Sequence, residues 1–221
     1  AFDTPGWDAG GDQALAGALV EPGSAGLGAN FEREQAGDVG LTTLSTPLPV
    51  LSEAAAGVGV VGFPTEVDGA VRRVNVLYPY GGQAYPAFSL VAATLYAGQP
   101  VLDDTQVQAS GGSFPINFRG PEQTFQTVPL YQVLGADLVE AGLMDAGELV
   151  DPQIFQDAIV LMGYTTFLEQ DRHMTPFAGR AGMAGVELQA NAIDTLLAGD
   201  WLHASPSWLN VLLIGVLGLW V

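Results

Sequence analysis

The chain has 221 residues and a formal net charge of -18, because 24 acidic residues stand against six basic ones, all of them arginine. This acidity argues against nucleic-acid binding, which needs Lys and Arg to displace phosphate counterions, and against a basic surface for anionic lipid. No cysteine is present, so disulfides, thiolate catalysis and cysteine-based zinc sites are excluded. The hydrophobic content of 48% supports a sizeable core.

The N-terminal part of the chain predicts short helices alternating with short strands. A helix is expected at Asp12–Val20, with Asp12 as its N-cap, and a second one at Pro47–Ala56. The apolar residues of Gly26–Phe31 predict a strand between them. Residues 32–46 are polar and rich in turn formers, so we expect a loop there.

The stretch Gly57–Tyr80 predicts two strands around a sharp turn. Its β-branched residues begin directly after Gly57, and Asp68-Gly69 favours the turn because glycine accepts a positive φ. Arg72 and Arg73 open the second strand, so their side chains are expected on opposite faces. One arginine is expected to pair with a carboxylate inside the fold, while the other faces water.

Further elements follow in the second half of the chain. Gly81-Gly82 predicts a turn, and Pro86–Ala97 predicts a helix with its proline in the first turn. A short strand is expected at Phe114–Phe118 and the start of a helix at Val128–Leu134. The apolar run Gln156–Gly163 predicts a strand in the buried centre of a sheet.

The clearest helical pattern covers Gly185–Gly199, where apolar residues recur on one face. Glu187, Asn191 and Asp194 recur on another face at the same spacing. Strands alternating with helices predict the α/β class, as a single domain with a β-sheet covered by helices. We expect this domain to occupy residues 1–205.

Residues 206–221 end in VLLIGVLGLWV, which is apolar on all faces of a helix. Two interpretations are open, a buried C-terminal helix and the start of a transmembrane helix. We favour the transmembrane helix, with Trp208 and His203 near the membrane interface.

Three arginines are candidates for binding an anionic ligand through the planar guanidinium fork. The alternative for Arg72 and Arg73 is a structural ion pair with a carboxylate, for which Asp68, Asp3 and Glu187 are the candidates. The alternative for Arg119, which precedes Gly120-Pro121, is a clamp on loop backbone.

Two further groups of polar residues are candidate sites. Asp171 and His173 could join Glu169 in a metal site or sense pH, or His173 could lie in a solvated loop. Glu187 and Asn191 lie one helical turn apart, so they could line a pocket or bind loop backbone. The chain lacks the GxSxG, P-loop and HExxH motifs, so we expect no catalytic residue and no cofactor or metal in this segment.

Several sequence blocks, taken in order, resemble the CHASE type-two family of extracytoplasmic sensory domains from bacterial membrane receptors. The blocks are Phe2-Asp3, Pro47-Leu48-Pro49, Asp68-Gly69-Ala70-Val71-Arg72-Arg73, Tyr85-Pro86-Ala87-Phe88, Asn117-Phe118-Arg119-Gly120, Asp171 with Thr175-Pro176, and Gly185-Val186-Glu187 with Ala190-Asn191. Each block by itself is weak, but their order and spacing are fairly specific and extend over most of the chain.

The resemblance implies a sensory domain outside the cytoplasmic membrane that acts on a cytoplasmic output domain. We expect control of an adenylate or guanylate cyclase through membrane helices in a homodimer, so that the full-length protein is a membrane-bound cyclase. The expected partners are the membrane, a second copy and a small ligand of unidentified chemistry. The expected ligand-binding residues are Arg72, Arg73, Arg119, Asp171, His173, Glu187 and Asn191.

Alternatives from other classes remain open. One is a ligand-free, membrane-anchored dimerisation or scaffold module. Another is the sensor of a kinase or of a diguanylate cyclase. A third is a soluble secreted enzyme, in which the C-terminal run folds back into a core.

Overall fold

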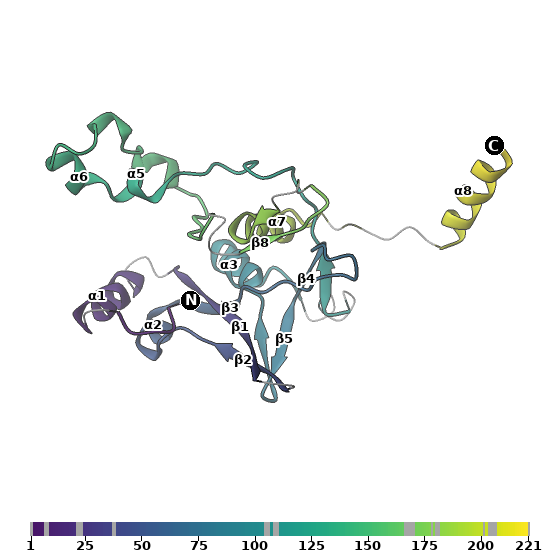
Figure 1. Cartoon of the computed structure of the whole chain (residues 1–221), viewed down its shortest axis with the longest axis horizontal. Helices are drawn as coiled ribbons and strands as arrows, with labels where there is room; N and C mark the ends of the chain where they lie inside the picture. The colour runs from purple at the N-terminus through teal and green to yellow at the C-terminus, as the bar shows by residue number, and fades with distance from the viewer. Residues whose placement is uncertain are drawn as a thin grey trace.

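The computed structural model describes residues 2–6, 9–20, 24–36, 39–103, 107, 111–165, 171–177, 179, 182–200, 202 and 207–220. Within these ranges the protein is a mixed α/β structure whose strands form one three-stranded sheet and three two-stranded sheets. The α/β class is therefore confirmed, but the expected helix-covered sheet is divided into small ladders. Figure 1 shows the three-stranded sheet and β5 below two central helices, α3 (Phe88–Ala97) and α7 (Gly185–Ala198).

The three-stranded sheet has the order β2-β1-β3, with β1 at Gly26–Ala36, β2 at Val39–Ser45 and β3 at Gly57–Val60. β1 is antiparallel to β2 and parallel to β3. The loop expected over residues 32–46 was wrong, because β1 continues through it and pairs with β2. A two-stranded ribbon satisfies its backbone groups in the ladder and needs no continuous apolar pattern.

Helices α1 (Ala9–Val20) and α2 (Pro49–Ala54) pack together beside this sheet. Their small core contains Ala16, Leu27 and Leu51. Asp12 is not the N-cap of α1, because the helix begins at Ala9. Its carboxylate instead accepts the Gly6 N–H, at 3.2 and 3.3 Å from its two oxygens.

Both strands expected in Gly57–Tyr80 are present, but they do not pair with each other. β4 (Arg73–Asn75) is antiparallel to β7 (Ser113–Pro115). β5 (Leu77–Tyr80) forms a hairpin with β6 (Gln83–Pro86) around Gly81-Gly82. The turn at Asp68-Gly69 is confirmed, with Gly69 at φ +82°.

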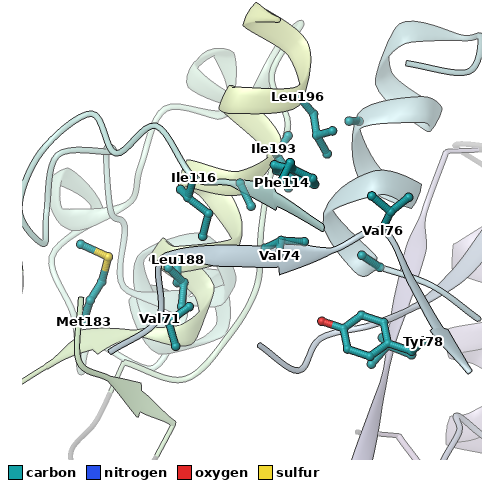
Figure 2. Close-up of a cluster of buried hydrophobic side chains, with 14 residues drawn as sticks. Val71, Val74, Val76, Tyr78, Phe114, Ile116, Met183, Leu188, Ile193 and Leu196 are labelled. Atoms are coloured by element: carbon teal, nitrogen blue, oxygen red, sulfur yellow. The ribbon is translucent and has the colours of Figure 1, made fainter. Parts of the chain in front are cut away.

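The main core lies where α3 and α7 meet β4 and β7 (Figure 2). Its labelled members are Val71, Val74, Val76, Tyr78, Phe114, Ile116, Met183, Leu188, Ile193 and Leu196. The expected helix at Pro86–Ala97 is confirmed as α3, but Pro86 lies in β6 and the helix begins at Phe88. The helix expected at Gly185–Gly199 is confirmed as α7.

A helical excursion follows β7 and lies above the main body in Figure 1. It contains α5 (Leu130–Leu134), α6 (Ala136–Glu140) and the short 3-10 helices η1 (Ala146–Glu148) and η2 (Pro152–Phe155). The helix start predicted near Val128 is thus confirmed. The side chains of Asp145 and Asp151 cap η1 and η2 by accepting backbone N–H groups.

The strand expected at Gln156–Gly163 has no ladder partner among the described strands. Ile159 and Leu161 pack against the main core, whereas Val160 and Met162 face solvent. The expectation of a buried central strand was therefore wrong in this structure. The apolar pattern of residues 156–163 predicts an extended strand, but it does not specify which other segments pair with that strand.

The chain closes with a two-stranded ladder and two helices. β8 (Arg172–His173) pairs with β9 (Met183–Ala184), which leads into α7. α8 (Ser207–Trp220) extends apart from the main body in Figure 1. Within the described ranges, no helix is both long and apolar enough to cross a membrane. The transmembrane start and the domain boundary at residue 205 stay predictions.

Candidate functional site

Three polar side chains follow one face of α7 at a spacing of four residues. They are Glu187, Asn191 and Thr195, with relative exposures of 7%, 0% and 0%. Side chains four residues apart lie one above the other on a helix, so the three form a buried polar row. Buried polar groups need hydrogen-bond partners, and the neighbouring loop supplies them.

The row binds backbone N–H groups of residues 117–125. Glu187 Oε1 accepts from Thr124 N at 3.0 Å and from Phe125 N at 3.3 Å. Asn191 Oδ1 accepts from Arg119 N at 2.9 Å, and Thr195 Oγ1 accepts from Asn117 N at 3.0 Å. We call these three side chains the α7 ladder, because they give an irregular loop the acceptors that a strand would otherwise provide.

The ladder residues also use their own donors within α7. Asn191 Nδ2 donates to Glu187 O at 2.9 Å, and Thr195 Oγ1 donates to Asn191 O at 2.8 Å. The side chains of Asn191 and Thr195 are thereby oriented by α7 itself. Of the two interpretations of Glu187 and Asn191, the geometry fits the one in which they bind loop backbone.

Arg119 joins the ladder through both its backbone and its side chain. The guanidinium Nε donates to Asp194 Oδ2, and Nη1 lies 3.6 Å from Asp200 Oδ2. The hydrogen bond to Asp194, followed by its charge, raises the pKa of Arg119 above its usual value. Loop and helix are therefore joined by an ion pair as well as by the ladder.

Asp171 and His173 lie together at the start of α7. His173 Nε2 lies 3.0 Å from Asp171 Oδ1, and the ring packs edge-on against Phe63 at 5.5 Å between centroids. A Cβ added to Gly185 would lie 2.4 Å from the Asp171 carboxylate oxygens, so this carboxylate lies against the first residue of α7. Negative charge is favourable there, because the N-terminal N–H groups of a helix carry partial positive charge.

Glu169, the third residue of the metal site considered for Asp171 and His173, lies outside the described residues. In the part of the chain that the structure describes, no cluster of three or more His, Asp or Glu residues could hold a metal ion. His203 also lies outside the described residues.

Sequence reasoning missed Arg172, which lies between two of the residues it selected. Its side chain is 11% exposed, and Nη2 lies 2.6 Å from both Glu122 Oε2 and Gly182 O. Glu122 belongs to the loop that the α7 ladder holds, so Arg172 holds that loop from the β8 side. Strand alternation could have indicated this role, since Arg172 must face away from its neighbours.

Arg72 and Arg73 have separate partners, although Arg72 directly precedes β4 and only Arg73 belongs to it. Arg72 Nη1 and Nη2 donate to the two carboxylate oxygens of Asp68, at 3.0 and 2.7 Å. Nη1 also donates to Glu66 Oε2 at 2.6 Å. The hydrogen bond from Arg72 lowers the pKa of Asp68 to about 2. Arg73 donates to Ser113 Oγ at 3.0 Å and to Ser113 O at 2.9 Å.

Of the carboxylates expected to meet these arginines, only Asp68 does so in the described hydrogen bonds. Asp3 accepts from the Ser45 hydroxyl at 2.5 Å, and Glu187 belongs to the α7 ladder. The paired arginine lies at the surface rather than inside the fold, with 38% of its side chain exposed. The turn at residues 66–70 brings Glu66 to the same guanidinium, a contact that the sequence did not indicate.

A comparison with protein-family models covers the Arg72 turn, the residue 117–125 loop and the start of α7 together. A model of the CHASE2 domain matches residues 1–221. The chain belongs to the CHASE2 family. CHASE2 domains are extracytoplasmic sensory domains. Comparison with curated proteins and with solved structures gives no match.

Two surface hollows of the CHASE2 domain are lined by residues other than those of the α7 ladder. One, of about 350 Å³, lies between the C-terminal ends of α3 and α7 and is lined by Gln99, Pro100, Leu196, Gly199 and their neighbours. The other is lined by Glu66, Val67 and Asp68, beside Arg72. None of the seven expected ligand-binding residues is among the residues that line these two hollows.

The structure thus divides the seven expected residues among separate places. Arg119, Glu187 and Asn191 meet in the α7 ladder, and Asp171 and His173 meet at the start of α7. Arg72 and Arg73 lie in their own clusters. A ligand-binding role for these residues stays a prediction.

Proposed function

We propose that this CHASE2 domain is the extracytoplasmic sensor of a bacterial transmembrane receptor located in the cell membrane. In this proposal it controls a cytoplasmic adenylate or guanylate cyclase from within a homodimer. The observation that carries the proposal is the α7 ladder, because it joins a surface loop to the helix that precedes α8 in the chain. The family match supports the sensory role.

Coupling through the ladder has a definite energetic basis. Separating α7 from the loop would break the four part-buried hydrogen bonds of the ladder, and each such bond contributes about 0.5–1.5 kcal/mol. The loop and α7 therefore move together more readily than apart. A ligand that prefers one arrangement of the loop would shift α7 with it, and couplings of about 1–3 kcal/mol are ordinary for allosteric proteins.

The membrane partner is proposed from α8 (Ser207–Trp220), whose sequence is apolar after Asn210. In this proposal α8 belongs to a membrane helix that begins near residue 206 and carries the displacement of α7 across the bilayer. The small ligand is unidentified, and the proposed signal is rotation or translation of two such helices relative to each other.

Insertion of alanines into α8 of the full-length protein tests this mechanism. Each inserted residue rotates the following helix by about 100°, since an α-helix has about 3.6 residues per turn. We expect cyclic AMP or cyclic GMP formation in membrane vesicles to rise and fall with a period near that of the helix. The same insertions placed after Gly142, in the helical excursion, are the control. A flat response to the α8 insertions would contradict the proposal.

A second candidate, a ligand-free dimerisation or scaffold module, is favoured by one observation. Arg72, Arg119, Glu187 and Asn191 are already hydrogen-bonded within the domain. A scaffold predicts an output that depends on the domain but ignores ligands, pH and metal ions. Output measured as cyclic di-GMP or as protein phosphorylation, with no cyclic AMP or cyclic GMP, would instead indicate a diguanylate cyclase or kinase receptor.

A further inference from the structure

Residues 158–165, here called the edge segment, have the side-chain alternation of a β-strand. Ile159 and Leu161 face inward and pack against the main core. Gly163 continues this inward face, because a Cβ added to it would lie 2.8 Å from the Val186 Cβ at the start of α7. The segment is therefore held flat against the body of the domain.

The outward face of the edge segment is apolar. Val160, Met162 and Tyr164 are 56%, 77% and 66% exposed. A strand with apolar residues on both faces is typical of a covered position in a sheet, not of an open surface.

Among the described residues, no backbone group pairs with the backbone of the edge segment. The described strands include none that forms a ladder with it, and no backbone–backbone hydrogen bond of residues 158–165 occurs among those described. At its end, Thr165 O accepts from Arg172 Nη1 at 3.3 Å. A row of unpaired N–H and C=O groups is a template for pairing with another chain.

The distribution of charge favours a second copy of this chain as the partner of the edge segment. The segment Ala158–Thr165 contains no charged residue, although the chain as a whole carries -18. The arginines whose side chains are described, Arg72, Arg73, Arg119 and Arg172, all donate hydrogen bonds within the domain. Each copy carries 24 acidic residues against six arginines, so an uncharged contact avoids bringing like charges together.

We propose that the edge segment is the surface on which a second copy of this chain docks, by antiparallel pairing of the two edge segments across a two-fold axis at Met162. This register places Val160 opposite Tyr164 of the other copy. Such β-branched and aromatic cross-strand pairs stabilise a sheet by about 0.2–1 kcal/mol each. A two-fold contact of this kind is closed, because each copy uses the same residues.

The inference names the surface of the homodimer and in that respect rests on the proposed function. One strand pair is a small interface, so we expect weak association in solution. Anchoring both copies in one membrane would raise their effective concentration and strengthen pairing without any new contact.

Because the chain has no cysteine, one introduced thiol reports on one position. The test uses the 221-residue chain in mild non-ionic detergent, with Met162→Cys and Leu143→Cys as matched variants. Both side chains are similarly exposed, at 77% and 78%. Residues facing each other across a two-fold antiparallel pair have Cα atoms about 4.5–5.5 Å apart, within disulfide range. We expect a covalent dimer on mild oxidation of Met162→Cys and little from Leu143→Cys.

Sedimentation velocity gives the second measurement. Met162→Lys places like charges together on the two-fold axis and should weaken dimerisation at least about tenfold, whereas Leu143→Lys should not. Equal cross-linking of the two cysteine variants, an open-ended polymer, or a monomer throughout the micromolar range would overturn the proposal. A monomer whose residue 158–165 amides resist hydrogen exchange would mean that another segment of the protein covers them. None of these failures would alter the period expected from the α8 insertions.

Discussion

At the scale of single residues, the ion pair of Asp68 predicts how stability changes at low pH. The hydrogen bond from Arg72 lowers the pKa of its carboxyl from 3.8 to about 2. Since the folded-state pKa lies below the unfolded one, the stabilisation is present above about pH 4 and is lost as the pH falls toward 2. NMR titration of the side-chain carboxyl should give a midpoint near 2 in the wild type and a higher one in Arg72→Met.

Asp3 is the control in that titration. Its pKa is lowered mainly by the Ser45 hydroxyl, and Arg72 is not among the causes. Its midpoint should therefore be the same in Arg72→Met and in the wild type. An unchanged Asp68 midpoint in the variant would show that the ion pair does not persist in solution.

Gly59 makes a second residue-scale prediction. A Cβ at this position would lie 2.5 Å from Phe88 Cα and 2.8 Å from Phe88 N, so backbone meets backbone where β3 passes the start of α3. Neither side can move by a rotamer change, and Gly59→Ala should lower the free energy of unfolding by about 1–3 kcal/mol or more. Chemical denaturation measures this loss.

Gly17 provides the matched control for Gly59. It lies within α1, and nothing lies within 4 Å of an added Cβ. Gly17→Ala should stabilise the helix by about 0.5–1 kcal/mol, because alanine loses less conformational freedom there. Equal effects of the two substitutions would contradict the close approach of β3 and α3.

At the scale of elements, the α7 ladder predicts different results for two changes at Glu187. Glu187→Gln keeps an acceptor for the Thr124 and Phe125 amides and should change stability by no more than about 1 kcal/mol. Glu187→Leu leaves both amides unsatisfied and should cost about 2–4 kcal/mol. Denaturation curves of both variants test the difference.

Hydrogen exchange localises the effect of the Glu187 variants. In Glu187→Leu, the amides of Thr124 and Phe125 should exchange faster, while Asn117, held by Thr195, stays protected. Unchanged exchange at Thr124 and Phe125 would show that other acceptors hold this loop.

Elements also show how far sequence patterns reach. The period of α7 was sufficient to place Glu187 and Asn191 on one face, and α2 and α3 were predicted close to their observed positions. The β1–β2 ribbon was missed because ladder hydrogen bonds, not apolar periodicity, hold it together. The run at residues 156–163 was placed inside a sheet because its apolar pattern is the same whether or not a neighbouring strand covers it.

At the scale of the whole molecule, the charge of -18 predicts a response to salt. Like charges repel within the folded chain, and salt shortens the Debye length from about 10 Å at 0.1 M to about 3 Å at 1 M. Salt also weakens the arginine ion pairs, but 24 acidic residues far outnumber six arginines. We therefore expect the thermal midpoint to rise with NaCl and to level off near molar concentrations.

KCl at the same ionic strength is the control for screening. It should raise the midpoint to the same extent, because screening depends on ionic strength and not on the identity of the cation. A midpoint that falls with both salts would mean that ion pairs outweigh repulsion in this domain.

The sequence by itself determined the α/β class, the CHASE2 resemblance, the turn at Asp68-Gly69 and the polar face of α7. These features depend on local periodicity, on turn chemistry and on the order of short blocks, all of which are present in the chain before it folds. Only the tertiary structure decided what each polar group meets. The bond from Arg73 to Ser113 and the bond from Arg119 N to Asn191 join residues 40 and 72 positions apart. Such partners depend on how the elements pack, which no local pattern specifies.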